Sequence, residues 1–301
     1  MKVKAGTAET AWERGRLDGR RGPSELLFGR MHEDASIELA AFRPGARVFC
    51  VASAGCTAMA LSPRHEVVAA DINPVQVAYA RRRFSGWRGC RGAAERMMAF
   101  GRACAPLVGW SPARLREFLG LDDPVEQIVF WRRQLDTRRF RVATDAILSR
   151  AVLRTVYAKP FLRACPRCFG RVMRRRMERC FARHSNRYNP YARALLLGEL
   201  ADAPTPPEAQ GIRLVHADAA TCLEREPAGC FEGFSLSNIL DGASDSYRRR
   251  LRAAVHRAAA PGAVAVIRSV AEPPSASATN RAPEDRAMLW GVVNVVPADV
   301  L

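Results

Sequence analysis

The chain has 301 residues, of which 48% are hydrophobic and 26% charged; this composition is typical of a globular protein and excludes an intrinsically disordered one. No uncharged apolar stretch of about eighteen residues occurs, so the sequence predicts no transmembrane helix. Residues 1–22 carry charge throughout and lack the apolar core of a secretory signal, so we expect a cytoplasmic protein whose nine cysteines are reduced.

The net charge of +17 is concentrated in one part of the chain. Residues 81–193 contain 26 Arg and one Lys against eight acidic residues, so the remainder of the chain is close to neutral. A basic region attached to a neutral domain indicates an anionic partner, which would be nucleic acid or an anionic membrane surface. The alternative interpretation is a solvated arginine-rich face that has no partner.

Short apolar runs separated by turn residues begin at Ala46. Residues 46–55 and 66–72 predict two buried parallel strands. Residues 73–84 predict a helix that has Asn73 as its N-cap and Pro74 in its first position. This order of strands and helices predicts an α/β fold built on a Rossmann-like parallel sheet.

The strand pattern is then interrupted by a long helical region. Helices are predicted over residues 110–121, 123–135, 144–157 and 171–184. In the last of these helices an apolar stripe is formed by Met173, Met177, Cys180, Phe181 and His184. Packing of this stripe against the main domain is the first interpretation, and insertion into a lipid interface is the second. A proline-rich linker, residues 201–211, ends the region.

Strand patterns return at residues 212–219, 231–240 and 263–272. A helix over residues 244–262 is expected to begin after Ser244 and to stop at Pro261 and Gly262, and residues 290–301 predict an edge strand. The sequence predicts three parts. Residues 1–23 form a mobile basic N-terminal segment, and residues 24–86 with 211–301 form a split Rossmann-like cofactor domain. Residues 87–210 form a basic helical insertion that serves as an acceptor site or lid or faces a membrane.

Small residues follow the first predicted strand, and an acidic residue follows the second. Ser53, Ala54 and Gly55 allow a ligand to approach the backbone, and Asp71 is placed to accept hydrogen bonds from ribose hydroxyls. The chain has no G-x-G-x-x-G turn here, which disfavours NAD or FAD and suits a nucleoside without phosphates, such as S-adenosylmethionine. A nucleotide-free α/β fold with a chance acidic residue is the alternative.

Polar residues also follow the third and fourth predicted strands. Asp218 is placed like an acid that contacts an adenine amino group. Asn238 and Asp241 end the fourth strand, where they either face the cleft or cap the next helix.

Six segments carry a more specific resemblance: residues 32–39, 53–61, 70–76, 187–198, 236–241 and 284–291. The strongest part is SAGC, starting at Ser53, followed by DINPVQ, starting at Asp71. In this order the segments resemble the S-adenosylmethionine:diacylglycerol 3-amino-3-carboxypropyltransferase family of betaine-lipid synthesis, from about Leu27 to the C-terminus. The resemblance implies a cofactor site for S-adenosylmethionine, built from Ser53, Ala54, Gly55, Asp71, Asn73 and Gln76, with Asp218 towards the adenine.

The family's reaction moves the aminocarboxypropyl arm of the cofactor onto a diacylglycerol hydroxyl and releases methylthioadenosine. The resemblance matches Glu33 and Asp34 to an acidic pair of the family, and Asp285 and Arg286 to a D-R pair. An alcohol nucleophile needs a base, for which the candidates are Asp241, Glu33, Asp34, Asp285 and His184. Arg286 is a candidate to bind the carboxylate of the arm in a bidentate fork. Each carboxylate has a structural ion pair with an arginine as its alternative role.

The expected partners follow from this activity. The acceptor is a lipid or a lipid-like alcohol, and the arginine-rich insertion would contact anionic lipid peripherally at the inner face of the membrane. Two alternatives remain open: a methyltransferase that acts on a small molecule or RNA, and a protein without enzymatic activity that binds nucleic acid. Nucleic acid is less favoured because the arginines are not interleaved with stacking aromatic residues.

One cysteine cluster approaches a zinc-finger spacing: Cys165, Cys168, Cys180 and His184. The segment is predicted to be helical and lies outside the resemblance, so we expect free thiols and no metal.

Overall fold

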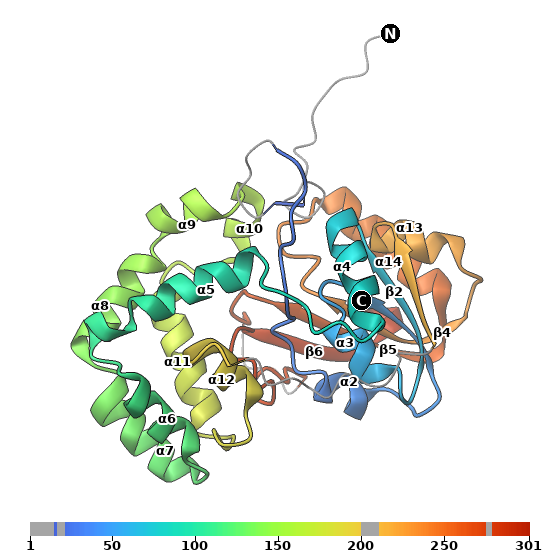
Figure 1. The fold of residues 1–301 in the computed structure, drawn as a ribbon. Helices are drawn as coiled ribbons and strands as arrows, with labels where there is room; N and C mark the ends of the chain where they lie inside the picture. The colour runs from blue at the N-terminus through green and yellow to red at the C-terminus, as the bar shows by residue number, and fades with distance from the viewer. Residues whose placement is uncertain (1–14, 17–21, 200–210, 275–278) are drawn as a thin grey trace.

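The computed structural model describes residues 15–16, 22–199, 211–274 and 279–301. A six-stranded sheet with the order β3-β2-β1-β4-β5-β6 forms the centre of one half of the molecule (Figure 1). The first five strands are parallel, and β6 runs antiparallel to β5 at the edge. Their bounds are β1 Arg47–Val51, β2 Glu66–Asp71, β3 Ile212–His216, β4 Phe231–Ser237, β5 Ala259–Ser269 and β6 Val292–Pro297. The predicted α/β class is confirmed, and the sheet is compatible with a Rossmann-like fold.

Both faces of the sheet are covered, which is why the central strands are apolar throughout. One face packs against α13 (Ala219–Arg225) and α14 (Asp245–Ala258) through Phe49, Val68 and Phe234. The other face packs Val48 and Val67 against the helices α2 (Ser36–Ala41) and α3 (Cys56–Leu61). The helix α4 (Pro74–Phe84) follows β2 and contacts β2 and β3.

Helix caps fix the elements beside the site. The side chain of Asn73 accepts a hydrogen bond from the Val75 amide, so α4 begins where the sequence predicts. Ser244 caps α14 in the same way. The predicted stop of this helix is wrong, because α14 ends at Ala258 and Pro261 lies within β5. Proline is tolerated there because the pairing of β4 with β5 is irregular between Phe231 and Gly233.

The helical region lies beside the sheet and has its own core (Figure 1). Trp131, Phe118 and Phe181 are fully buried at its centre. The predicted helix over residues 144–157 is wrong in one respect: it is divided in two, because Ser149 caps a new helix by accepting a hydrogen bond from the Val152 amide. The elements are α5 Ala93–Ala103, the 3₁₀ turn η1 Ala105–Val108, α6 Pro112–Gly120, α7 Pro124–Phe130, the π-helical turn η2 Trp131–Leu135, α8 Arg138–Ile147, α9 Arg150–Val156, α10 Lys159–Ala164, α11 Phe169–Phe181 and α12 Pro190–Leu196.

Helix α11 joins this region to the C-terminal segment. Met177, Cys180 and Phe181 are buried in the same cluster as Met288, so the apolar stripe of α11 packs within the protein. The buried Arg176 donates hydrogen bonds to the carbonyl oxygens of Val270 (2.9 Å) and Leu289. No helix in the described part of the chain combines the length and apolar character that a membrane span requires. Residues 201–210 of the predicted linker and nearly all of the predicted mobile segment over 1–23 lie outside the described residues.

Candidate functional site

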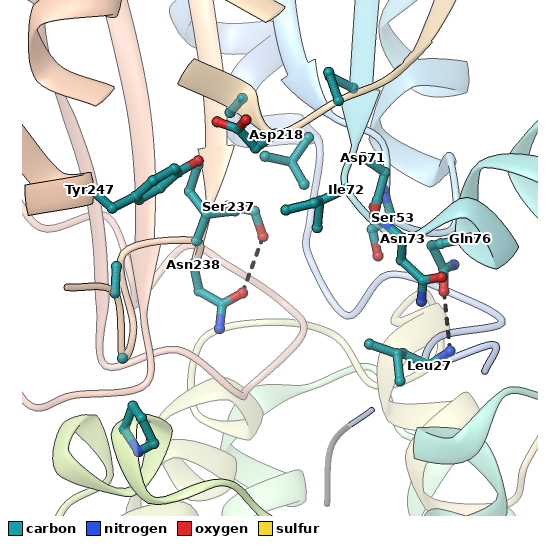
Figure 2. A pocket seen from close by; sticks show the side chains of 18 of the residues that line it. Leu27, Ser53, Asp71, Ile72, Asn73, Gln76, Asp218, Ser237, Asn238 and Tyr247 are labelled. Carbon is teal, nitrogen blue, oxygen red and sulfur yellow. Dashed lines mark hydrogen bonds between the residues drawn. The ribbon is translucent and has the colours of Figure 1, made fainter. Parts of the chain in front are cut away.

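A cavity of about 600 Å³ opens where β1, β2 and β4 end, a size typical of small-molecule sites. In Figure 2, Ser53, Asp71, Asn73 and Gln76 lie on one side, and Asp218, Ser237, Asn238 and Tyr247 lie on the other. Carboxyl ends of parallel strands are the usual place for a ligand in such sheets.

Asp71 links the ends of the two neighbouring strands β1 and β2. Its Oδ2 accepts a hydrogen bond from the Ser53 amide at 2.9 Å, and its Oδ1 accepts one from the Asn73 amide at 2.8 Å. Burial raises the pKa of Asp71 to about 6, although both backbone hydrogen bonds act to lower it. Each carboxylate oxygen keeps a lone pair beyond these bonds, so Asp71 can still accept hydroxyl donors from a ligand.

Unusual backbone geometry also gathers at this cavity. Positive φ angles occur at three non-glycine residues of the described chain, Ser53 (43°), Ser237 (52°) and Met288 (64°), and the two serines line the cavity. L-residues rarely adopt this conformation, and such positions cluster at ligand sites because the surrounding fold must impose them. The surrounding fold therefore imposes the backbone conformation at the ends of β1 and β4.

Asn73 and Gln76 bind an N-terminal segment, residues 25–28, which is called the strap below. Gln76 accepts hydrogen bonds from the amides of Leu27 (3.2 Å) and Phe28 (3.3 Å) and donates one to the Phe28 carbonyl oxygen (2.7 Å). Asn73 donates to the Glu25 carbonyl oxygen at 2.9 Å. Leu27 and Phe28 line the cavity as a result. Both predicted cofactor residues thus shape the wall while their amide groups are engaged by the strap.

Ala54 and Gly55 lie outside the lining, although the sequence predicts cofactor contacts for both. The Ala54 carbonyl oxygen accepts a hydrogen bond from buried Arg83. Gly55 has a φ of 83° and begins α3, and a Cβ at this position would lie 2.6 Å from Cε1 of Phe84. These residues make the turn after β1 possible, since only glycine fits both the conformation and the space.

The opposite wall contains two residues that the sequence predicts, Asp218 and Asn238, and others that it did not indicate. Asn238 lines the cavity, and its Nδ2 lies 3.5 Å from Asp241 Oδ2. Asp218 caps α13 by accepting a hydrogen bond from the Thr221 amide at 3.1 Å, and its side chain still lines the cavity. Ser237, Tyr247 and Arg163 also line it. Ser237 lies in the segment 236–241 that carries the resemblance, but the sequence assigns it no role, and no motif marks Tyr247 or Arg163. Arg163 is exposed and has no hydrogen-bond or ion-pair partner among the described residues.

A second cavity of about 510 Å³ adjoins the first. The two share Pro160, Arg163, Gly242 and Ala243 in their walls. Asp241 lines the second cavity, where its carboxylate accepts hydrogen bonds from Ser269 Oγ (2.6 Å) and the Val270 amide (2.9 Å). Burial raises its pKa against these bonds. Asp241 thus ties the end of β4 to the end of β5 and does not cap α14.

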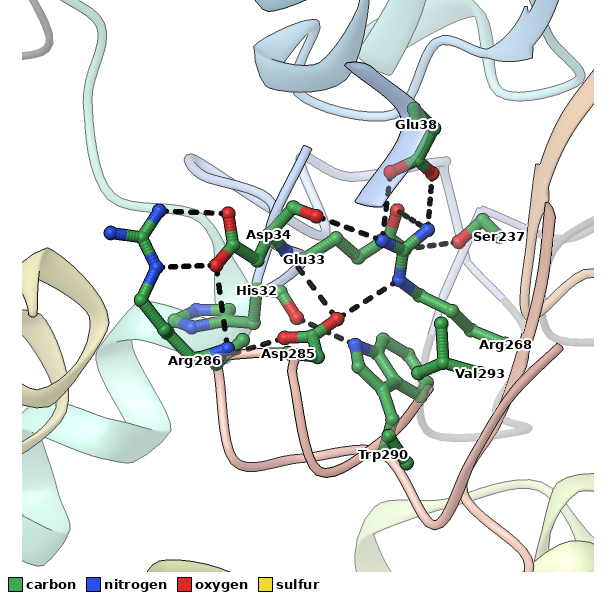
Figure 3. Close-up of polar contacts among 12 residues, drawn as sticks. His32, Glu33, Asp34, Glu38, Ser237, Arg268, Asp285, Arg286, Trp290 and Val293 are labelled. Carbon is green, nitrogen blue, oxygen red and sulfur yellow. Dashed lines mark hydrogen bonds and ion pairs between the residues drawn. The ribbon is translucent and has the colours of Figure 1, made fainter. Parts of the chain in front are cut away.

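A buried charge network lies behind the end of β4 (Figure 3). Arg268, fully buried, binds both carboxylate oxygens of Glu38 and donates to Asp285 Oδ2 at 3.2 Å. Arg286 forms a fork with the carboxylate of Asp34. Burial raises the pKa of Asp285 to about 6 despite the nearby Arg268. Burial would also raise the pKa of Asp34, but the hydrogen bonds and charge of Arg286 outweigh it and lower that pKa.

The structure therefore brings together four residues from opposite ends of the sequence: Glu33, Asp34, Asp285 and Arg286. None of them lines either cavity. The guanidinium of Arg286 is occupied by Asp34, so its predicted role as the ligand's carboxylate fork would require breaking an existing pair. Glu33 reaches the first cavity indirectly, because the Ser237 hydroxyl donates a hydrogen bond to its Oε1.

The remaining candidates have structural contacts. His184 Nε2 lies 3.0 Å from the Pro283 carbonyl oxygen, and Cys180 Sγ lies 3.7 Å from the Arg286 carbonyl oxygen. Within the described ranges, no three His, Cys, Asp or Glu side chains are grouped so as to hold a metal ion.

Comparisons with models of protein families, with curated proteins and with solved structures found no match for this chain.

Proposed function

We propose that this protein is an S-adenosylmethionine-dependent transferase that moves the 3-amino-3-carboxypropyl group to a hydroxyl of a lipid or lipid-like acceptor and releases methylthioadenosine. The observation that supports it most is the position of Asp71 at the carboxyl ends of the adjacent parallel strands β1 and β2. The Ser53 and Asn73 amides hold its carboxylate there, and this carboxylate can still accept hydrogen bonds from a ligand in the cavity. An acid in this place suits ribose hydroxyls. The turn after β1 lacks the glycine-rich loop that a pyrophosphate needs.

The residues of the cavity fit the parts of S-adenosylmethionine. Asp71 would accept the ribose hydroxyls, and the wall with Asp218 and Tyr247 would take the adenine. Arg163 is the cation in the described lining that no protein carboxylate neutralises, so it would bind the carboxylate of the amino acid arm. It takes the place that the sequence assigns to Arg286.

Arg163 also favours transfer of the arm over transfer of the methyl group. When bound, S-adenosylmethionine supplies electrophilic carbons on a positively charged sulfur, and the group transferred is the one aimed at the acceptor. Arg163 borders both cavities, so a carboxylate held by it places the arm beside the second cavity. Pro160, Leu240 and Ile267 give that cavity an apolar part suited to a lipid-like acceptor. Its lining also includes the charged Asp241, Asp245 and Arg248.

The helical region supports contact with a membrane surface. It carries strongly exposed apolar side chains together with the excess of arginine: Phe100 (70%), Leu107 (76%), Val142 (63%) and Ile147 (50%). Basic residues near an anionic bilayer contribute about 1 kcal/mol each. We expect the protein to sediment with vesicles of phosphatidylserine and phosphatidylcholine, and not with vesicles of phosphatidylcholine alone. Equal recovery with both would contradict this part of the proposal.

The reaction is tested by its nucleoside product. The protein is incubated with S-adenosylmethionine and dioleoylglycerol in mixed micelles, and the nucleosides are separated by chromatography. Methylthioadenosine formed in step with acceptor supports transfer of the arm, whereas S-adenosylhomocysteine identifies a methyltransferase instead. A wild-type protein that binds no S-adenosylmethionine in calorimetry would refute both activities.

A further inference from the structure

Glu33 is the carboxylate of the buried network that receives no hydrogen bond from an arginine. Arg268 donates hydrogen bonds to Glu38, to Asp285 and to the Asp34 carbonyl oxygen, but its closest approach to Glu33 is an ion pair of 3.7 Å. Glu33 Oε2 is buried and has no hydrogen-bond partner among the described residues. A buried carboxylate oxygen without a donor favours the protonated form of the group.

The surroundings of Glu33 carry an excess of negative charge. Four carboxylates share two arginines in this network: Glu33, Asp34, Glu38 and Asp285 with Arg268 and Arg286. From the side of β1 the buried thiol of Cys50 also faces the group. Burial raises the pKa of Glu33 to about 7, against the lowering effects of Arg268 and the Ser237 hydroxyl, and Glu38 and Asp285 raise it further. Glu33 can therefore take up a proton at neutral pH.

Ser237 connects this carboxylate to the first cavity. Its side chain lines the cavity at the end of β4, and its hydroxyl donates to Glu33 Oε1. A hydroxyl that donates its proton in one direction keeps lone pairs for a donor in the other. The left-handed backbone at Ser237 (φ 52°) is the kind of imposed geometry that marks functional positions.

We propose that Ser237 and Glu33 form a proton relay for the acceptor, an inference that rests on the proposed function and assigns its base. An acceptor seated in the second cavity would extend its hydroxyl past the shared wall at Gly242 and Ala243 into the first cavity, which Ser237 lines. There the acceptor hydroxyl donates its proton to Ser237 Oγ, and the Ser237 proton passes to Glu33 Oε1. One proton leaves the acceptor, one arrives at Glu33, and the serine is regenerated. Ser237 is the catalytic residue that touches the acceptor, and Glu33 is the positioning residue that holds the proton behind it.

The first test measures protons without any acceptor. Calorimetric titration with S-adenosylmethionine at pH 7, in two buffers of different ionisation enthalpy, counts the protons released on binding. The cationic sulfur should displace the proton from half-protonated Glu33, so wild type should release up to about half a proton more than Glu33→Gln. Methylthioadenosine, which is neutral, should show no such difference between the two proteins. Equal proton counts for both proteins with S-adenosylmethionine overturn the relay.

The second test uses turnover with dioleoylglycerol. Both Glu33→Gln and Ser237→Ala should lower the rate of methylthioadenosine release by about 10²- to 10⁴-fold, while S-adenosylmethionine still binds. The control is Ser62→Ala: Ser62 donates its hydroxyl to the Met59 carbonyl oxygen at 3.2 Å, and it lies neither in the charge network nor in the lining of either cavity. It should keep both the rate and the proton count. If Ser237→Ala turns over as fast as wild type, only the relay is overturned. If wild type binds no S-adenosylmethionine, both the relay and the proposed function are overturned.

Discussion

Replacement of Glu33 by glutamine is expected to stabilise the fold in a pH-dependent way, although it should impair the reaction. Glutamine has the shape of the protonated carboxyl group, and its Oε1 can still accept the Ser237 hydroxyl. The pKa of Glu33 is about 7 in the folded protein, where burial raises it, compared with 4.5 for a free side chain. A raised acid pKa means that the folded state is favoured fully below pH 4.5 and loses this contribution as pH rises through 7.

The magnitude follows from this difference. At about 1.4 kcal/mol per pKa unit, the ionised form of Glu33 costs the folded state about 3 kcal/mol above pH 8. Urea unfolding of wild type and Glu33→Gln should give similar free energies at pH 4.5, and a gain for the variant that grows to about 3 kcal/mol at pH 8.5. A gain that does not change with pH, or a loss at pH 8.5, would refute the account of Glu33 as a surplus buried charge.

Three further predictions concern the cavity. Asp71→Asn should weaken S-adenosylmethionine binding in calorimetry at least tenfold. Burial raises the pKa of Asp71 to about 6, so wild-type affinity should fall as pH drops through 6 and Asp71 becomes protonated. The affinity of the variant should lack this pH dependence. Arg163→Ala should weaken S-adenosylmethionine about tenfold or more but leave methylthioadenosine, which lacks the carboxylate, unaffected; an equal loss for both ligands would place the carboxylate elsewhere. Gln76→Ala removes three hydrogen bonds to the strap and should speed proteolysis near Leu27 and weaken the ligand, and the exposed Gln134→Ala serves as its control.

The sheet and its ligand-facing edge could be predicted because they depend on local pattern. Apolar runs gave β1 and β2, and the Asn73-Pro74 pair gave the start of α4. Given two adjacent parallel strands, Asp71 must lie next to the turn that contains Ser53, as the hydrogen bond between them confirms. The same local signals wrongly predict a cofactor contact for Gly55. Its glycine is needed for a positive φ and for space against Phe84, and the sequence does not distinguish this need from the close approach of a ligand.

The charge network could not be predicted, because its pairs are distant in sequence. Arg268 and Glu38 are separated by 230 residues, and Arg286 and Asp34 by 252. In a chain with 47 basic and 30 acidic residues, composition does not indicate which arginine neutralises which carboxylate. The resemblance therefore predicts two pairs of neighbours, Glu33 with Asp34 and Asp285 with Arg286, but not that the two pairs meet. Their shared environment and the unneutralised charge on Glu33 appear only in three dimensions.

The cavity and the relay depend on different parts of the fold. The Asp71 site needs only the ends of β1 and β2 and the start of α4. The environment of Glu33 needs α2 for Glu38, β5 for Arg268 and the C-terminal segment for Asp285. The helical region adds a clamp from α12, because the Tyr191 hydroxyl donates to the Glu33 backbone carbonyl oxygen at 2.7 Å. Helix α10 carries Arg163, which lines both cavities, so a disturbance of α10 should reach the cofactor cavity directly. A disturbance confined to α12 should instead reach the proton relay through the backbone of Glu33, so proton release measures how α12 is docked.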